Sequence, residues 1–97
     1  MKTVFVIASA KAKEGKEEEL SLALKAVVEP TRAEPGCELY ELYTAEEQGD
    51  FFFYERWVSR DALKEHTQTA HYKKLERNIP QLLEGEFSVH ILTPASL

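Results

Sequence analysis

The sequence is short of cysteine, of basic blocks and of long hydrophobic runs, and each shortage excludes a class of protein. A single cysteine, Cys37, allows neither an internal disulfide nor a multi-cysteine metal site, which suits a reducing cytoplasm. No apolar run approaches the roughly 20 residues that span a bilayer, so we expect no membrane partner. A net charge of -5 with no basic cluster disfavours nucleic acid. We therefore expect a cytoplasmic protein.

Motifs that hold common cofactors are missing as well. The chain has no glycine-rich phosphate loop, no dinucleotide fingerprint and no flavin or haem attachment motif. Any redox chemistry is therefore expected to proceed without these cofactors. The 97 residues suffice for one domain, covering 1–97, and a hydrophobic content of 43% favours a folded globule.

What is present is a regular alternation of strand and helix patterns. Period-two alternation predicts strands at residues 2–8, 37–44, 51–58 and 87–93. A helical stripe of apolar residues follows residue 16, and Pro30 should kink or stop that helix. Ser59 is a natural N-cap for a second helical segment, which is interrupted at 67–70 and continues past Pro80.

The order strand, helix, strand, strand, helix, strand predicts an α+β fold of the ferredoxin-like βαββαβ type, an antiparallel sheet with its helices on one face. Several strands carry large apolar residues on both faces, which would leave a hydrophobic patch on the uncovered face. Two sheets packed face to face would bury it. We therefore expect a homodimer with an interface of at least the ~1,600 Å² standard class.

Glu55 is predicted to lie among aromatic residues, because Phe51, Phe53 and Trp57 share its face of the third strand. A carboxyl group in such surroundings either has its pKa raised, which makes it a candidate proton carrier, or is held ionised by a partner. The candidate partners are Arg32, Arg56 and a histidine.

His66 and His71 are five residues apart, which in an unbroken helix would place them on different faces. Two helical zinc ligands normally stand three or four residues apart and need a third partner, so the spacing argues against a metal site. Either histidine could act alone as a general acid or base, since an unperturbed pKa near ~6.5 suits proton transfer at neutral pH. The alternative for each is a solvent-facing or capping histidine.

The only tryptophan, Trp57, is more typical of a core or a dimer interface than of a substrate platform. Cys37 follows a Pro-Gly turn without an evident activating base, which predicts a buried structural thiol.

Three segments, PTRAEPGCELYELY, FFFYERWVSRDALKEH and TAHYKKL, resemble the antibiotic biosynthesis monooxygenase (ABM) domain family over essentially the whole chain. The pattern looks like the small quinol monooxygenase branch and also like the autoinducer-2 degradation proteins. The resemblance implies ferredoxin-like dimers whose sheets pack into an α/β barrel. It also implies cofactor-free oxidation of a quinol- or anthrone-like aromatic substrate by molecular oxygen.

Under this resemblance the proton-handling candidates are Glu55, His66 and His71. An aromatic wall would be formed by Phe53, Trp57, Tyr40 and Tyr72, and Arg32 could orient a substrate oxygen.

Two other functions stay open at this point. One is isomerisation of a phosphorylated keto-sugar, anchored by a basic residue such as Arg32, Lys73 or Lys74. The other is a dimeric module that binds small aromatics without turnover. Haem breakdown is disfavoured, because the pattern of that branch has an asparagine on the first strand and KTVFVIAS has none.

Overall fold

The computed structural model describes residues 2–46 and 49–95. It contains four strands, four α-helices and one 3₁₀ turn among these residues. Their bounds are β1 Val4–Lys11, α1 Glu17–Lys25, α2 Val28–Arg32, β2 Cys37–Thr44, β3 Asp50–Trp57, α3 Arg60–His66, α4 Ala70–Asn78, η1 Pro80–Leu82 and β4 Ser88–Leu92.

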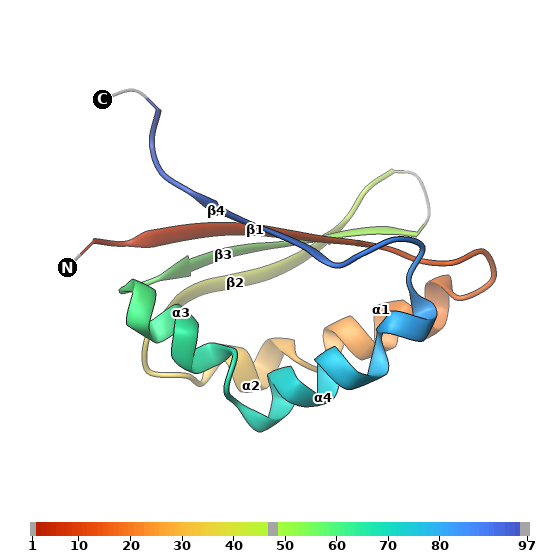
Figure 1. Ribbon diagram of the computed structural model, residues 1–97, viewed down its shortest axis with the longest axis horizontal. Helices are drawn as coiled ribbons and strands as arrows, with labels where there is room; N and C mark the ends of the chain where they lie inside the picture. Colours follow the sequence, from red (N-terminus) through yellow and green to blue (C-terminus); the bar gives the residue numbers. More distant parts are fainter. Residues whose placement is uncertain (1, 47–48, 96–97) are drawn as a thin grey trace.

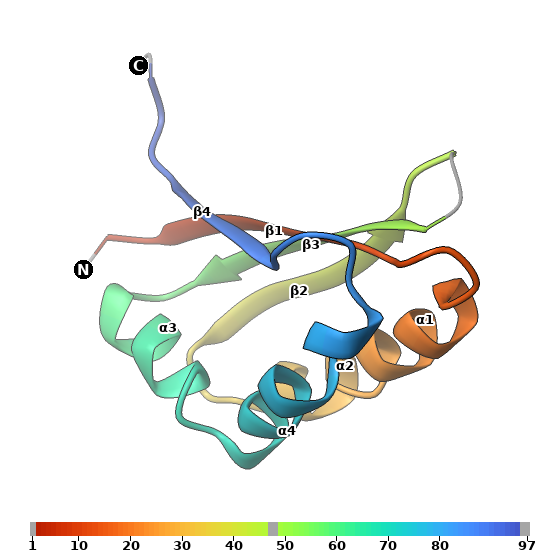
Figure 2. The same ribbon diagram turned by 45° about the vertical axis from the view of Figure 1, so that its right-hand side comes forward.

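The strands form one antiparallel sheet in the order β2-β3-β1-β4, and all the helices cover the same face of it (Figure 1). The predicted ferredoxin-like α+β fold is thereby confirmed. Figure 2 shows α3 and α4 with α1 and α2 as one layer beneath the sheet. The sheet is open in the single chain. Among the described residues, no helix is long and apolar enough to cross a membrane.

The predicted faces of the two central strands are also confirmed. In β1, Val4, Val6 and Ala8 are buried against the helices, and Phe5 and Ile7 lie on the other face. In β3, Phe51, Phe53, Glu55 and Trp57 are buried on the helix side. These rows meet because Val6 pairs with Glu55 and Ala8 with Phe53 across the β1–β3 ladder.

The bounds of some elements differ from the prediction. Strand β1 extends to Lys11 rather than ending at Ala8, because its alternation continues through the buried Ala10. The first helix breaks before Pro30, between Lys25 and Val28, and Pro30 lies in the first turn of α2. Proline is tolerated there because an N–H in the first turn has no intrahelical acceptor. Part of the predicted hairpin loop, residues 47–48, lies outside the described residues.

Gly36 fixes how closely α3 approaches the turn before β2. A Cβ atom on Gly36 would collide with the Cβ of Ala62 in α3, and the Gly36 carbonyl accepts a hydrogen bond from Val58 N at 2.9 Å. Only a residue without a side chain permits this approach. Ala62 precedes His66, the last residue of α3, by four residues, and Glu34 lies two residues before Gly36, so this contact lies close to both.

The variant G36A should lower the free energy of unfolding by about 1–3 kcal/mol, because the added methyl group overpacks this contact. Urea denaturation measures the loss. In the double variant G36A/A62G the collision is removed, so its loss should be smaller than the sum of the two single losses. Additive losses would show that the close approach of Gly36 to Ala62 is not what limits this position.

Candidate active site

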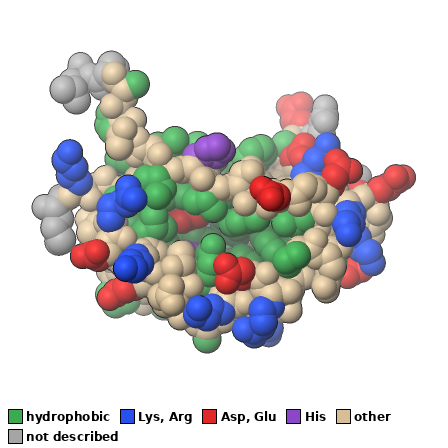
Figure 3. Space-filling view, viewed as in Figure 1, with side chains coloured by type: hydrophobic (Ala, Val, Ile, Leu, Met, Phe, Trp, Pro, Cys, Tyr) green, Lys and Arg blue, Asp and Glu red, His purple; other side chains and the backbone are tan. Residues whose placement is uncertain are grey.

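A cavity of about 170 Å³ lies between the sheet and the helical layer. Its mostly apolar lining includes a carboxyl group, an imidazole and a phenol from three different elements, Glu55 of β3, His66 of α3 and Tyr72 of α4. The remaining lining residues are Val6, Ala8, Tyr40, Leu63, Thr67, Phe87, Val89 and Ile91. Figure 3 shows hydrophobic side chains gathered in the hollow between sheet and helices. A few polar groups in an apolar pocket are typical of small-molecule sites.

Glu55 is buried, with 4% of its surface exposed, and burial raises the pKa of its carboxyl group to about 7. The indole Nε1–H of Trp57 donates a 2.9 Å hydrogen bond to Oε1, which opposes the shift, and the nearby charge of Glu34 adds to it. Of the two alternatives for Glu55, the structure therefore favours the raised pKa.

The partners expected to hold Glu55 ionised lie elsewhere. Arg56 pairs with Glu38 on the opposite face of the sheet, at 3.2 Å. Arg32 is exposed and donates from Nε to the backbone carbonyl of Tyr40 at 2.9 Å. Glu55 instead accepts a hydrogen bond from the indole N–H of Trp57, two residues further along the same face of β3.

His66 is the last residue of α3 and is 2% exposed. Its ring packs among the aromatic rings of Trp57, Tyr72 and Tyr40, with centroid distances of 4.7, 5.0 and 5.6 Å. Burial is the main cause that lowers the pKa of His66, which favours the neutral ring, whereas its hydrogen bond to Glu34 acts in the opposite direction. The solvent-facing and capping alternatives do not describe this residue.

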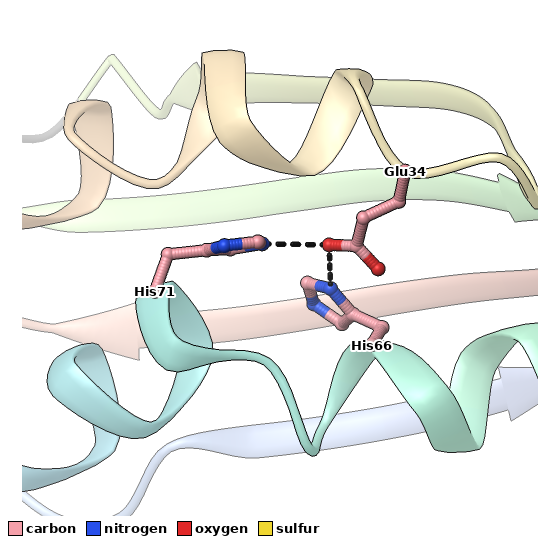
Figure 4. A group of neighbouring side chains, drawn as sticks. All are labelled: Glu34, His66 and His71. Carbon is pink, nitrogen blue, oxygen red and sulfur yellow. Dashed lines mark hydrogen bonds and ion pairs between the residues drawn. The ribbon is translucent and has the colours of Figure 1, made fainter.

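His66 and His71 converge because the helix between them is broken. Helix α3 ends at His66, and Thr69 caps α4 by accepting a hydrogen bond from Tyr72 N at 3.2 Å. The Thr69 hydroxyl also donates to the carbonyl of His66 at 2.7 Å. This turn brings both rings to one carboxylate, that of Glu34 (Figure 4).

Glu34 is the residue that sequence reasoning missed. It follows α2, and one of its oxygens, Oε2, lies 2.8 Å from His66 Nδ1 and 2.7 Å from His71 Nε2. It stands in the segment that resembles the ABM pattern, but no local spacing connects it to histidines 32 and 37 residues away.

His66 and His71 do not share one unbroken helix, so their five-residue spacing does not by itself exclude a metal site. Glu34, His66 and His71 each offer one atom that could bind a metal ion, and these three atoms lie within 4.8 Å of one another. Both nitrogen–oxygen distances, 2.8 Å to His66 and 2.7 Å to His71, are those of hydrogen bonds. We therefore describe the group as a hydrogen-bonded cluster.

The predicted substrate-binding residues divide into two groups. Tyr40 and Tyr72 line the cavity, whereas Phe53 and Trp57 are 1% and 0% exposed and are not in its lining. Tyr40 stacks on Phe53 with a centroid distance of 4.8 Å. The buried rings of Phe53 and Trp57 therefore support the wall of the cavity without lining it. Arg32 lines a separate surface pocket with Cys37, so its contact with a substrate oxygen stays a prediction that this cavity does not support.

Cys37 is partly buried, and burial raises the pKa of its thiol to about 11. A thiol with a raised pKa is a poor nucleophile at neutral pH, which agrees with a structural role.

The cavity adjoins a wider groove of about 370 Å³, with which it shares Tyr72, Phe87 and Val89. The carboxylates of Glu76 and Glu86 also line this groove. A molecule too large for the inner cavity could therefore extend between α4 and the segment that leads into β4.

A ferredoxin-like sheet with a buried carboxyl group and a neutral imidazole under one helical layer defines a small α+β domain with a pocket suited to proton transfer. Residues 3–78 match the family model described as antibiotic biosynthesis monooxygenase. The chain belongs to this family.

Individual relatives agree with this assignment. A candidate monooxygenase of Mycobacterium tuberculosis, Rv0793, is 39% identical over 75 residues, which cover 77% of this chain and 74% of that protein. The solved structure of Rv0793 superposes with a TM-score of 0.93 at 34% identity, covering 99% of this chain and 98% of that one. YcnE of Bacillus subtilis, also a candidate monooxygenase, is 31% identical over 80 residues, covering 81% of this chain and 84% of that protein.

The raised pKa of Glu55 predicts how stability depends on pH. The carboxyl group titrates near 4.5 in the unfolded chain and at about 7 in the folded protein, so between these values the folded state binds more protons. The free energy of unfolding should therefore contain a contribution that is lost as pH rises from about 4.5 to 7. Replacing Glu55 by Gln should remove this contribution. The free energy of unfolding of E55Q, relative to that of the wild type, should therefore rise by up to roughly 3 kcal/mol between pH 5 and pH 8.

Urea denaturation of both proteins at pH 5 and pH 8 measures the difference. The matched control is E65Q, which removes an exposed carboxylate of α3 and should run parallel to the wild type. If the free energy of unfolding changed equally in E55Q and the wild type between pH 5 and pH 8, the raised pKa of Glu55 would be contradicted.

Proposed function

We propose that the protein is a cofactor-independent monooxygenase that oxidises a quinol- or anthrone-like aromatic substrate with molecular oxygen. The observation that carries the proposal is the pairing of Glu55, with a pKa of about 7, and neutral His66 in one apolar cavity. Two groups that exchange protons near neutral pH, in a mostly apolar site, are what deprotonation of a weakly acidic aromatic substrate requires.

In this mechanism His66 accepts a proton from the substrate, because its ring is neutral and lines the cavity. Glu55 exists in both protonation states at neutral pH, and Oε1 is engaged by Trp57. A protonated Glu55 therefore carries its hydrogen on Oε2 and can donate it to the oxygen of the substrate anion. A neutral carboxylic acid in an apolar site stabilises an oxyanion in this way.

The oxidation itself draws its electrons from the substrate. The anion reduces molecular oxygen and forms a new carbon–oxygen bond, giving a hydroperoxide after it takes up a proton. Loss of water from this intermediate leaves one oxygen atom in the oxidised product and the other in the water molecule.

The shape of the site agrees with a flat aromatic substrate. An apolar cavity of about 150 Å³ takes up benzene in another protein, and the cavity here is about 170 Å³ with Tyr40 and Tyr72 in its wall. The adjoining groove leaves room for further rings.

A phosphorylated substrate finds less support. Among the described residues, no lysine or arginine lines the cavity or the groove, and the groove carries two carboxylates, Glu76 and Glu86. A phosphate group placed there would meet charge of its own sign. Isomerisation of a phosphorylated keto-sugar therefore ranks below oxidation of an aromatic.

Oxygen uptake with a panel of reduced quinols and anthrones, with a metal chelator present, tests the activity. Saturable uptake is expected for the wild type, and H66Q and E55Q should each lose at least about tenfold in kcat, because a positioned proton-transfer group contributes roughly 10²- to 10⁴-fold.

The matched control is E65Q, since Glu65 is exposed on α3 and does not line the cavity. It should retain wild-type turnover. Binding of these aromatics without uptake above the uncatalysed rate would instead establish a binding module and refute the monooxygenase.

We also propose that the protein is a homodimer joined through the sheet face that carries no helices (Figure 1). This outer face presents a continuous set of large apolar side chains, namely Phe5, Ile7, Tyr43, Phe52, Tyr54 and Leu92. Phe52 and Tyr54 are 39% and 37% exposed, which is uncommon for neighbouring aromatics in a monomer. A second copy of the same face would bury them.

A charged residue in this face should prevent association. We expect F52E to behave as a monomer in analytical ultracentrifugation, because pairing would bury an unpartnered carboxylate. The matched control is L22E, since Leu22 is 61% exposed on α1 and lies away from the outer face. A wild-type protein that sediments as a monomer would refute the dimer.

A further inference from the structure

Glu34 joins three parts of the chain at a single oxygen atom. Its Oε2 is 2.8 Å from Nδ1 of His66 and 2.7 Å from Nε2 of His71, and Figure 4 shows both rings directed at it. The side chains of Glu34 and His66 are only 12% and 3% exposed. The interaction is therefore shielded from most solvent competition.

We propose that Glu34 is a positioning residue that holds the hydrogen of His66 on Nδ1 and so leaves Nε2 as the proton acceptor of the cavity. The catalytic part of this inference rests on the proposed function, whereas the tautomer is a property of the protein alone.

The tautomer follows from hydrogen-bond chemistry. An ionised carboxylate only accepts hydrogen bonds, so a ring nitrogen 2.8 Å from it must carry hydrogen. A neutral imidazole has one N–H, so with that hydrogen on Nδ1 its Nε2 keeps a lone pair. Among the described residues, no group forms a hydrogen bond to Nε2 of His66, and the residue lines the cavity.

Glu34 also stabilises the product of proton uptake. When Nε2 takes a proton the ring becomes an imidazolium, and the adjacent carboxylate raises the pKa of His66 through its hydrogen bond and its charge. Burial and the neighbouring His71 act in the opposite direction. A carboxylate behind a histidine has the same two tasks in other proton-transfer sites, where it fixes the tautomer and balances the charge.

Several groups besides Glu34 face His66, and each contributes to its environment. From β2, β3 and α4 these are Tyr40, Glu55, Trp57, His71 and Tyr72. Only Glu34 forms a hydrogen bond to the ring among the described residues. His71 donates to the same oxygen of Glu34, which restrains the rotation of the carboxylate.

Nitrogen-15 NMR of histidine-labelled protein measures the tautomer without any substrate. We expect the wild type at neutral pH to show His66 with a protonated Nδ1 and a bare Nε2. In E34Q the Nε2-protonated form should become populated and the pKa of His66 should fall, because the charge that favours the imidazolium is removed. A wild-type ring protonated on Nε2, or an unchanged tautomer and pKa in E34Q, would overturn the proposal.

Two variants serve as controls. In H71Q the carboxylate remains, so the tautomer of His66 should persist although the second donor is altered. E65Q removes an exposed carboxylate next to His66 in sequence and should leave the spectrum and the turnover unchanged. Elemental analysis of the purified protein completes the set, since one equivalent of bound metal at the cluster would replace the proton on Nδ1 and overturn the proposal.

Kinetics then test the consequence for catalysis. E34Q should lose at least about tenfold in kcat with KM within about twofold of wild type, and the acid limb of its pH profile should move to lower pH. A purely structural role would not shift that limb. If the wild type turns over none of the substrates, the proposed function fails, and the NMR result still decides whether Glu34 sets the tautomer.

Discussion

Burial of the inner face of the sheet under one helical layer is the constraint on which the other features depend. That layer buries the inward-facing side chains of β1 and β3. The aromatic residues among them leave Glu55 with few polar neighbours. The cover is interrupted between α3 and α4, where α3 ends at His66 and Thr69 caps α4. The cavity lies over the part of the sheet that this interrupted layer covers, so the site arises from the way the layers pack.

The charge of Glu34 acts on both Glu55 and His66 in the cavity. It raises the pKa of Glu55 by repulsion between like charges and raises the pKa of His66 by attraction to the imidazolium. Burial disfavours the charged form of each group, which raises the pKa of the acid and lowers that of the base. One carboxylate at the edge of the cavity therefore favours the protonated form of both Glu55 and His66.

The edge strand β4 explains how a buried site stays open to small molecules. Val89 and Ile91 pair with Ala8 and Val6 and belong to the inner face, but they are 48% and 42% exposed. The helical layer leaves these two residues half-exposed, and both line the cavity. This member of the ABM family therefore has an accessible pocket. The family fold by itself fixes neither the substrate nor the reaction.

The sequence by itself determined the strands and the faces of β1 and β3, the N-cap at Ser59, and the placement of Glu55 among aromatic residues, because these depend on local periodicity. It predicted neither the role of Glu34 nor the hydrogen bond from Trp57 to Glu55, and it placed Arg32 near a site whose lining excludes it. Those facts depend on how layers from distant parts of the chain approach one another. Side chains 32 and 37 residues apart meet at one oxygen only after α3 and α4 have packed against the turn that follows α2, so the tertiary structure alone decided that contact.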